Sequence, residues 1–122
     1  MEASSFAIHL EKSIPKFKEL WAIEDIYREE NRSFSPHSLV AFLRDFILFE
    51  YPQIKSEELV QIAKSIEQVF IEDPDSHWSD GPTLKDALIT NFLSIAPEPA
   101  VGGLSIKEYL GPISQSLWDR CP

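Results

Sequence analysis

The segment from Glu72 to Pro82, EDPDSHWSDGP, gathers several groups that could do chemistry. Its prolines, glycine and serines predict a loop. Asp73 and Asp75 have the D-x-D spacing that opens a calcium-binding EF-hand loop, but such a loop needs glycine at its sixth position and glutamate at its twelfth. Those positions hold Trp78 and Leu84, so we expect no calcium site here.

Two interpretations of this acidic loop remain open. In the first, the aspartates cap turns and helix ends and otherwise face water. In the second, the loop is an acidic patch around an aromatic anchor and binds a basic protein. Trp78 lies outside any apolar helical stripe, and tryptophan is enriched among the residues that dominate binding energies. The predicted partner-binding residues of the loop are Glu72, Asp73, Asp75, Trp78 and Asp80.

A second acidic run lies at helical spacing and has the same two interpretations. Arg28 and Arg32 could pair with some of its carboxylates, which would make it an ordinary solvated helix face. Alternatively, it contributes to the binding surface. The residues of this run are Glu24, Asp25, Glu29 and Glu30.

The sequence contains none of the common catalytic or cofactor-binding motifs. The three histidines, His9, His37 and His77, are too far apart to share a helical turn, and H-E-x-x-H, G-x-S-x-G, P-loop and G-x-G-x-x-G patterns are missing. We therefore expect a protein that is not an enzyme and that holds no metal and no cofactor. Distant carboxylates that converge in space, as in glycosidases, are the remaining route to catalysis.

Charge indicates what kind of partner fits. Twenty acidic residues against eleven basic ones give a net charge of −9. Such a surface repels nucleic acid and anionic membranes, since both are bound mainly through Lys and Arg. A basic protein is favoured, because complementary charge speeds encounter and rejects wrong partners.

Features of the two ends predict a cytoplasmic protein. Cys121 is the only cysteine, so an internal disulfide cannot form. The first residues, MEASSFAIHLEKSIPKF, lack the basic and apolar regions of a signal peptide.

The segment Ser35–Tyr51 is predicted to be the central helix. Ser35 and Pro36 stand in the order typical of an N-cap and a first helical residue, and Pro52 ends the pattern. Apolar residues surround this helix almost completely, whereas a surface helix has one apolar stripe. They are Leu39, Val40, Phe42, Leu43, Phe46, Ile47, Leu48 and Phe49. We therefore expect neighbouring elements on several sides of it.

Two helices are expected before it. A short one, capped by Ser4 or Ser5, runs to about Ser13. Pro15 interrupts the pattern. A second helix then covers 16–30 with a wide apolar stripe that includes Trp21.

Helical patterns also fill the C-terminal half. Ser56 is the expected N-cap of an amphipathic helix that runs to about Glu72, and Thr83 caps a fifth helix with Asp86 in the capping-box position. The segment Leu104–Trp118 reads as two short helical pieces that divide at Gly111–Pro112. The sequence therefore predicts one all-α domain over residues 1–122, a compact bundle of five to six helices.

The C-terminal segment resembles a signature of small all-helical bacterial proteins of unassigned activity, several of which look like immunity proteins. The residues that carry the resemblance are Tyr109-Leu110-Gly111-Pro112, Ser114 and Leu117-Trp118, together with Ile14-Pro15-Lys16-Phe17 near the other end. The resemblance implies neutralisation of a toxin made by the same or a neighbouring cell. It implies no catalytic residues, and it gives the Tyr-Leu-Gly-Pro residues a structural role in a tight turn between helices.

Two functions are consistent with these features. The first is an immunity protein that neutralises a basic toxin, most readily a nuclease, by occluding its active site with an acidic surface. The second is an adaptor or regulatory domain that binds a helix or peptide of a host complex between two amphipathic helices. Salt should weaken binding strongly in the first case and little in the second.

Overall fold

The computed structural model describes residues 2–23, 35–50, 54–72, 83–93 and 103–120. Within these ranges the chain forms seven α-helices, one π-helical turn and no strand, so the all-α class is confirmed, while the expected number was five or six helices. The elements are α1 (Ala3–Ser13), α2 (Pro15–Ile23), α3 (Pro36–Glu50), α4 (Ser56–Glu72), α5 (Leu84–Leu88), the π turn η3 (Ile89–Leu93), α6 (Gly103–Tyr109) and α7 (Pro112–Arg120). None of the described helices is both long and apolar enough to cross a membrane.

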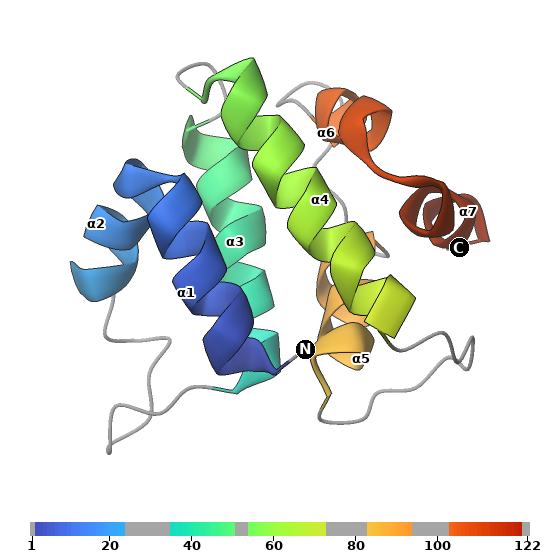
Figure 1. Ribbon diagram of the computed structural model, residues 1–122, viewed down its shortest axis with the longest axis horizontal. Coiled ribbons are helices and arrows are strands. Elements are labelled where there is room, and N and C mark those ends of the chain that lie inside the picture. The colour runs from blue at the N-terminus through green and yellow to red at the C-terminus, as the bar shows by residue number, and fades with distance from the viewer. Residues whose placement is uncertain (1, 24–34, 51–53, 73–82, 94–102, 121–122) are drawn as a thin grey trace.

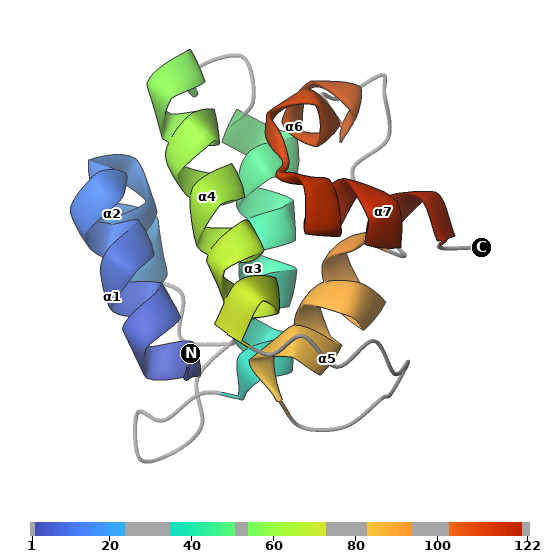
Figure 2. The ribbon, with the colours of Figure 1, turned by 45° about the vertical axis from the view of Figure 1, so that its right-hand side comes forward.

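Helix α3 lies between two groups of helices (Figure 1). It contacts α1 on one side and α5 and η3 on the other, and α4 contacts α1, α5, α6 and α7. Figure 2 shows the same arrangement from another direction, with α1 and α2 on one side of α3 and α4, and with α5, α6 and α7 on the other. Every residue of α3 except Phe49 is buried or half-buried. The expectation that this helix has neighbours on several sides is confirmed.

Two predicted N-caps are confirmed. The Ser35 hydroxyl accepts a hydrogen bond from the backbone N–H of Ser38 at 3.1 Å, and α3 begins at Pro36. Thr83 and Asp86 form a complete capping box at the start of α5. The Thr83 hydroxyl accepts the Asp86 N–H at 3.1 Å, and the Asp86 carboxylate accepts the Thr83 N–H at 3.3 Å. Each cap satisfies donors that a helix start otherwise leaves to water.

The prediction of a serine cap for the first helix is wrong. Helix α1 begins at Ala3, and its N-cap is Glu2, whose side chain makes no capping hydrogen bond. Ser4 and Ser5 therefore lie inside the helix. Helix ends are defined only to within one or two residues, so the local sequence specifies the first residue weakly.

The cap of α4 lies one residue before the predicted one. Ser56 is the first helical residue, and the backbone N–H of Lys55 donates to the Glu58 carboxylate at 3.0 Å. This is the half of a capping box in which the third helical residue reaches back to the N-cap. The Lys55 carbonyl also accepts hydrogen bonds from Glu58 and Leu59 N–H, as expected of a residue at the helix start.

An aromatic cluster joins α2 to α3. The Phe17 ring packs edge-on against Phe42 and Phe46, with centroid distances of 5.4 and 5.5 Å, and Trp21 lies 4.9 Å from Phe42. Edge-to-face pairs of this kind stabilise beyond the area they bury. Trp21 is 2% exposed, which confirms its predicted place in the core, while Trp118 is half-buried and packs against the core.

The predicted break between α6 and α7 is confirmed, and a side chain of α4 holds it in place. The Glu67 carboxylate accepts the N–H groups of Ile113 and Ser114 at 3.1 and 2.9 Å, and the Ser114 hydroxyl at 2.7 Å. A Cβ atom added to Gly111 would lie 2.6 Å from Glu67 Cγ. Glycine lets the carboxylate reach the first turn of α7, where the positive end of the helix dipole favours an anion.

The π turn η3 is linked to α3 by polar contacts. The Asn91 amide bonds His37 Nδ1, and the Asn91 carbonyl accepts a hydrogen bond from Arg44 Nη1 at 3.3 Å. Where α5 continues into η3, the Thr90 hydroxyl donates to the Asp86 carbonyl at 2.8 Å. These side chains supply partners to backbone and side-chain groups where the α-helical ladder changes to the wider π pattern.

Candidate protein-binding groove

Of the nine predicted partner-binding residues, Glu72 alone lies within the described ranges. It is the last residue of α4, is exposed, and accepts a hydrogen bond from Gln68 Nε2 at 3.2 Å. The others lie outside the described residues, and their predicted role stays a prediction. They are Asp73, Asp75, Trp78, Asp80, Glu24, Asp25, Glu29 and Glu30.

A hollow of about 300 Å³ opens between α2 and α3. Its apolar lining includes two strongly exposed side chains, Phe49 at 79% and Ile23 at 70%. Large exposed apolar side chains that meet at one hollow are typical of a site covered by a partner. The full lining is Leu20, Ile23, Phe42, Asp45, Phe46, Phe49 and Glu50.

Two further hollows, of about 330 and 430 Å³, follow towards the start of α4. The first shares Phe46 and Glu50 with the hollow between α2 and α3, and the two further hollows share Pro15, Lys55 and Glu58. Because neighbouring hollows share lining residues, we treat the three as one surface and call it the α2–α3–α4 groove. It is apolar between α2 and α3 and more polar near the start of α4.

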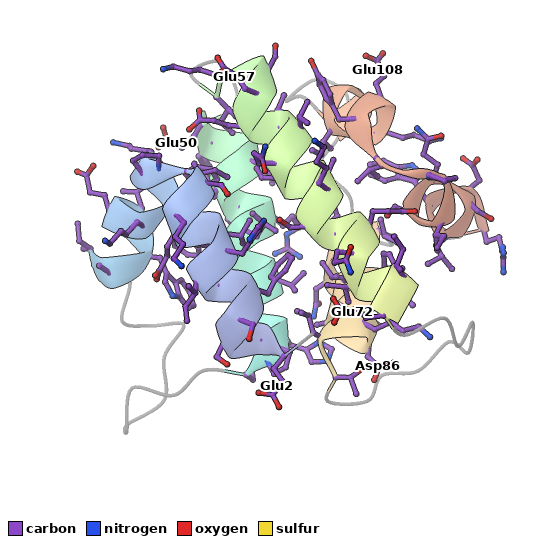
Figure 3. The ribbon with its side chains drawn as sticks, viewed as in Figure 1. Glu2, Glu50, Glu57, Glu72, Asp86 and Glu108 are labelled. Atoms are coloured by element: carbon purple, nitrogen blue, oxygen red, sulfur yellow. The ribbon has the colours of Figure 1, made fainter. Side chains whose placement is uncertain are left out.

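The rim of the groove is mainly acidic. Four carboxylate side chains and two lysines line its three hollows: Asp45, Glu50, Glu57, Glu58, Lys16 and Lys55. Figure 3 shows Glu50 and Glu57 at one end of the molecule, and Glu72 and Asp86 towards the opposite end. A mainly negative rim around an apolar floor favours a partner that offers apolar and basic side chains together.

The floor of the groove is held by the core. Phe42 and Phe46 line the hollow between α2 and α3, and both pack against Phe17 in the aromatic cluster. Rigid aromatic side chains lose little conformational entropy when a partner packs on them, which favours tight binding. Phe49 follows the buried Phe46 and Ile47 along α3, and its exposed side chain forms the edge of the same surface.

The sequence did not single out Phe49 or Ile23 as site residues. A signal was present, because Phe46, Ile47, Leu48 and Phe49 are consecutive. Successive residues of a helix point about 100° apart, so four consecutive apolar side chains cannot all face one core. The sequence alone does not say which of them remains outside.

The described residues offer little that resembles a reaction centre. No three His, Cys, Asp or Glu side chains among them come close enough to hold a metal ion. Histidine and arginine meet at the contact between α3 and η3, where His37 and Arg44 both bond Asn91. These bonds tie two helices together, and this arrangement presents no nucleophile beside a base.

No family model, no curated protein and no solved structure matches this chain. Function is therefore inferred from the residues of the chain and from the surface they form.

Proposed function

We propose that this chain is a non-enzymatic binding protein whose partner is a basic protein. The observation that supports the proposal most directly is the α2–α3–α4 groove, where exposed apolar side chains lie beside four carboxylates. The net charge of −9 adds long-range attraction for a basic partner and repulsion for nucleic acid and anionic membranes. No cofactor, metal or reaction is part of this proposal.

In its more specific form, the proposal is a bacterial immunity protein that acts in the cytoplasm. Its acidic surface would cover the active site of a basic toxin, most readily a nuclease, because a nuclease must be positive where its substrate binds. The residues proposed for this contact are the two acidic segments of the sequence. They are Glu72, Asp73, Asp75, Trp78 and Asp80, with Glu24, Asp25, Glu29 and Glu30.

The adaptor function is the second candidate, and the apolar hollow between α2 and α3 favours it. Phe49 and Ile23 leave apolar area exposed between two helices, as in proteins that bind a helix in a groove. The two candidates differ in salt dependence. Occlusion by acidic segments predicts association that slows steeply with ionic strength, whereas a mostly apolar contact predicts a weak dependence.

The test is capture of the partner on the tagged full-length chain in lysate of its source cells, with elution by steps of increasing salt. We expect one basic protein, identified by mass spectrometry, to be released as salt rises. Charge reversal of Asp73, Asp75 and Asp80 to lysine should slow association and reduce its salt dependence, and Glu108→Lys on α6 is the matched control. Recovery of no basic protein would refute the proposed function, and unchanged association by the triple variant would remove the loop from the interface.

A further inference from the structure

We infer that the α2–α3–α4 groove receives an amphipathic, basic α-helix of the partner protein. This inference rests on the proposed function and names the part of the partner that is recognised. The partner helix would place its apolar face on Phe49 and Ile23, and its Lys or Arg side chains beside Asp45 and Glu50.

The apolar contact is the first step of the argument. Phe49 is 79% exposed and Ile23 is 70% exposed, and both line the same hollow as the buried Phe42 and Phe46. A partner that covers them adds new apolar burial to a floor that folding has already ordered. A few side chains that a partner covers completely commonly supply most of the binding energy of an interface.

Charge complementarity selects the occupant. Asp45 and Glu50 line the apolar hollow, and Glu57 and Glu58 extend the acidic rim towards the start of α4. Lys16 and Lys55 offset this charge in part, and so does Arg44, which pairs with Asp45 at 3.4 Å. A second copy of this chain would bring a further charge of −9 to an already acidic surface, and an anionic membrane would be repelled likewise. A basic protein segment is attracted.

The geometry of the groove favours a helical segment over an extended one. An extended peptide commonly gains affinity by adding a strand to the edge of a sheet, and the described part of the chain contains no strand and so no such edge. A helix needs only apolar side chains at successive turns to fill a hollow between helices. Here the hollow lies between α2 and α3, with carboxylates placed along its rim.

Two synthetic peptides test the inference on the full-length protein. One is a fluorescent 14-residue (roughly four-turn) Leu/Lys helix, and the other has the same leucine face with Glu in place of Lys. We expect the basic peptide to bind and the acidic one to bind far more weakly. Phe49→Ser should raise Kd about ten- to a hundredfold, which corresponds to loss of most of a buried Phe side chain. Glu50→Lys should raise Kd and reduce its dependence on salt.

Matched controls are available away from the groove. Ile71 is 53% exposed, and Glu72 beside it lies towards the opposite end of the molecule from Glu50 (Figure 3). Ile71→Ser, and Glu108→Lys at an exposed position of α6, make the same chemical changes away from the groove, and each should leave Kd within about twofold of the wild-type value. Thermal unfolding of the Phe49→Ser variant should match wild type, because the side chain is exposed.

Several outcomes would overturn the inference. Equal effects of Phe49→Ser and Ile71→Ser would show that the peptide binds without using the groove. Equal affinity for the acidic peptide would remove the role of charge. A dimer that Phe49→Ser dissociates, measured by analytical ultracentrifugation, would identify a second copy as the occupant. A clear drop in the melting temperature of Phe49→Ser would show that the chain itself covers the hollow.

The capture experiment separates this inference from the proposed function. If wild type and Phe49→Ser capture the same basic protein equally well, the proposed function stands and the groove inference fails. If neither wild type nor Phe49→Ser captures a basic protein, but the basic peptide still binds the groove of wild type, the proposed function fails and the groove inference does not. Capture by wild type that is lost in Phe49→Ser and kept in Ile71→Ser supports both.

Discussion

The Glu67→Ala substitution should detach the C-terminal helix from α4. The Glu67 carboxylate is the acceptor for three donors at the start of α7: the N–H groups of Ile113 and Ser114 and the Ser114 hydroxyl. Ser114 is fully buried, so water cannot replace the carboxylate there without a rearrangement. Alanine removes the acceptor and leaves the donors in place.

The size of the effect follows from which donors can reach water. The Ile113 N–H is at an exposed position, so loss of its bond costs little. The N–H and hydroxyl of Ser114 become unsatisfied, at about 1–3 kcal/mol for each buried group, and the lost interaction with the helix dipole adds about 0.3–1 kcal/mol. Partial relaxation lowers the total. We expect the free energy of unfolding to fall by about 2–4 kcal/mol.

Urea unfolding followed by far-ultraviolet circular dichroism measures this loss, and hydrogen exchange locates it. Exchange should accelerate most in α7, with a smaller effect in α3. Glu67→Gln is the graded control, because its amide keeps one oxygen acceptor but loses the charge, and it should cost about half as much. Glu72→Ala, at an exposed position of the same helix, should change stability by less than about 0.5 kcal/mol.

The reasoning would be refuted by a Glu67→Ala variant whose unfolding free energy and α7 exchange rates both match those of wild type. That result would show that α7 is held by its apolar contacts alone, chiefly those of the buried Leu117.

Two further substitutions test local features of the fold by the same unfolding assay. Gly111→Ala places a Cβ 2.6 Å from Glu67 Cγ, so the carboxylate must move away from α7; we expect a loss of about 1–3 kcal/mol that does not add to the Glu67→Ala loss, and full additivity would contradict the shared cause. Thr83→Ala breaks the capping box with Asp86 and should cost about 1 kcal/mol, whereas a neutral result would show that the box does not stabilise α5.

Features that depend on neighbouring residues in the sequence could be predicted. Ser35 caps α3 and Thr83 caps α5 because each accepts hydrogen bonds within three residues of itself. The break at Gly111 is likewise visible in the order glycine then proline. The start of α4 is harder to predict, because two neighbouring residues could each serve as its N-cap. Glu58 caps the Lys55 N–H, and a serine at position 56 looks like an equally good cap from sequence alone.

Features that join distant residues could not be predicted. Glu67 and Ser114 are 47 positions apart, and nothing in either neighbourhood indicates that the carboxylate reaches the other helix. The same is true of the bond from Arg44 to the Asn91 carbonyl, which secures the π turn. Such contacts are set by how helices pack, and helix periodicity reports only which face is apolar.

Some features of the candidate groove could be predicted from the sequence and others could not. Its acidic character could be expected from the charge of the chain, and a site between amphipathic helices is one of the two functions with which the sequence is consistent. Its position was not predicted, because Phe49 has the residue type of a core side chain. Packing of α2 against Phe42 and Phe46 leaves Phe49 outside.

The junction of α1 and α2 makes the length of this part of the chain critical. Ile14 alone separates the two helices: its N–H bonds the Leu10 carbonyl at 2.8 Å, and its carbonyl accepts the Lys18 N–H at 3.2 Å. Its backbone is extended, as expected before Pro15. One inserted residue would lengthen this one-residue connection by up to about 3.5 Å and change the direction in which α2 leaves it. Phe17 would then leave the core, so this corner should tolerate substitutions far better than insertions or deletions.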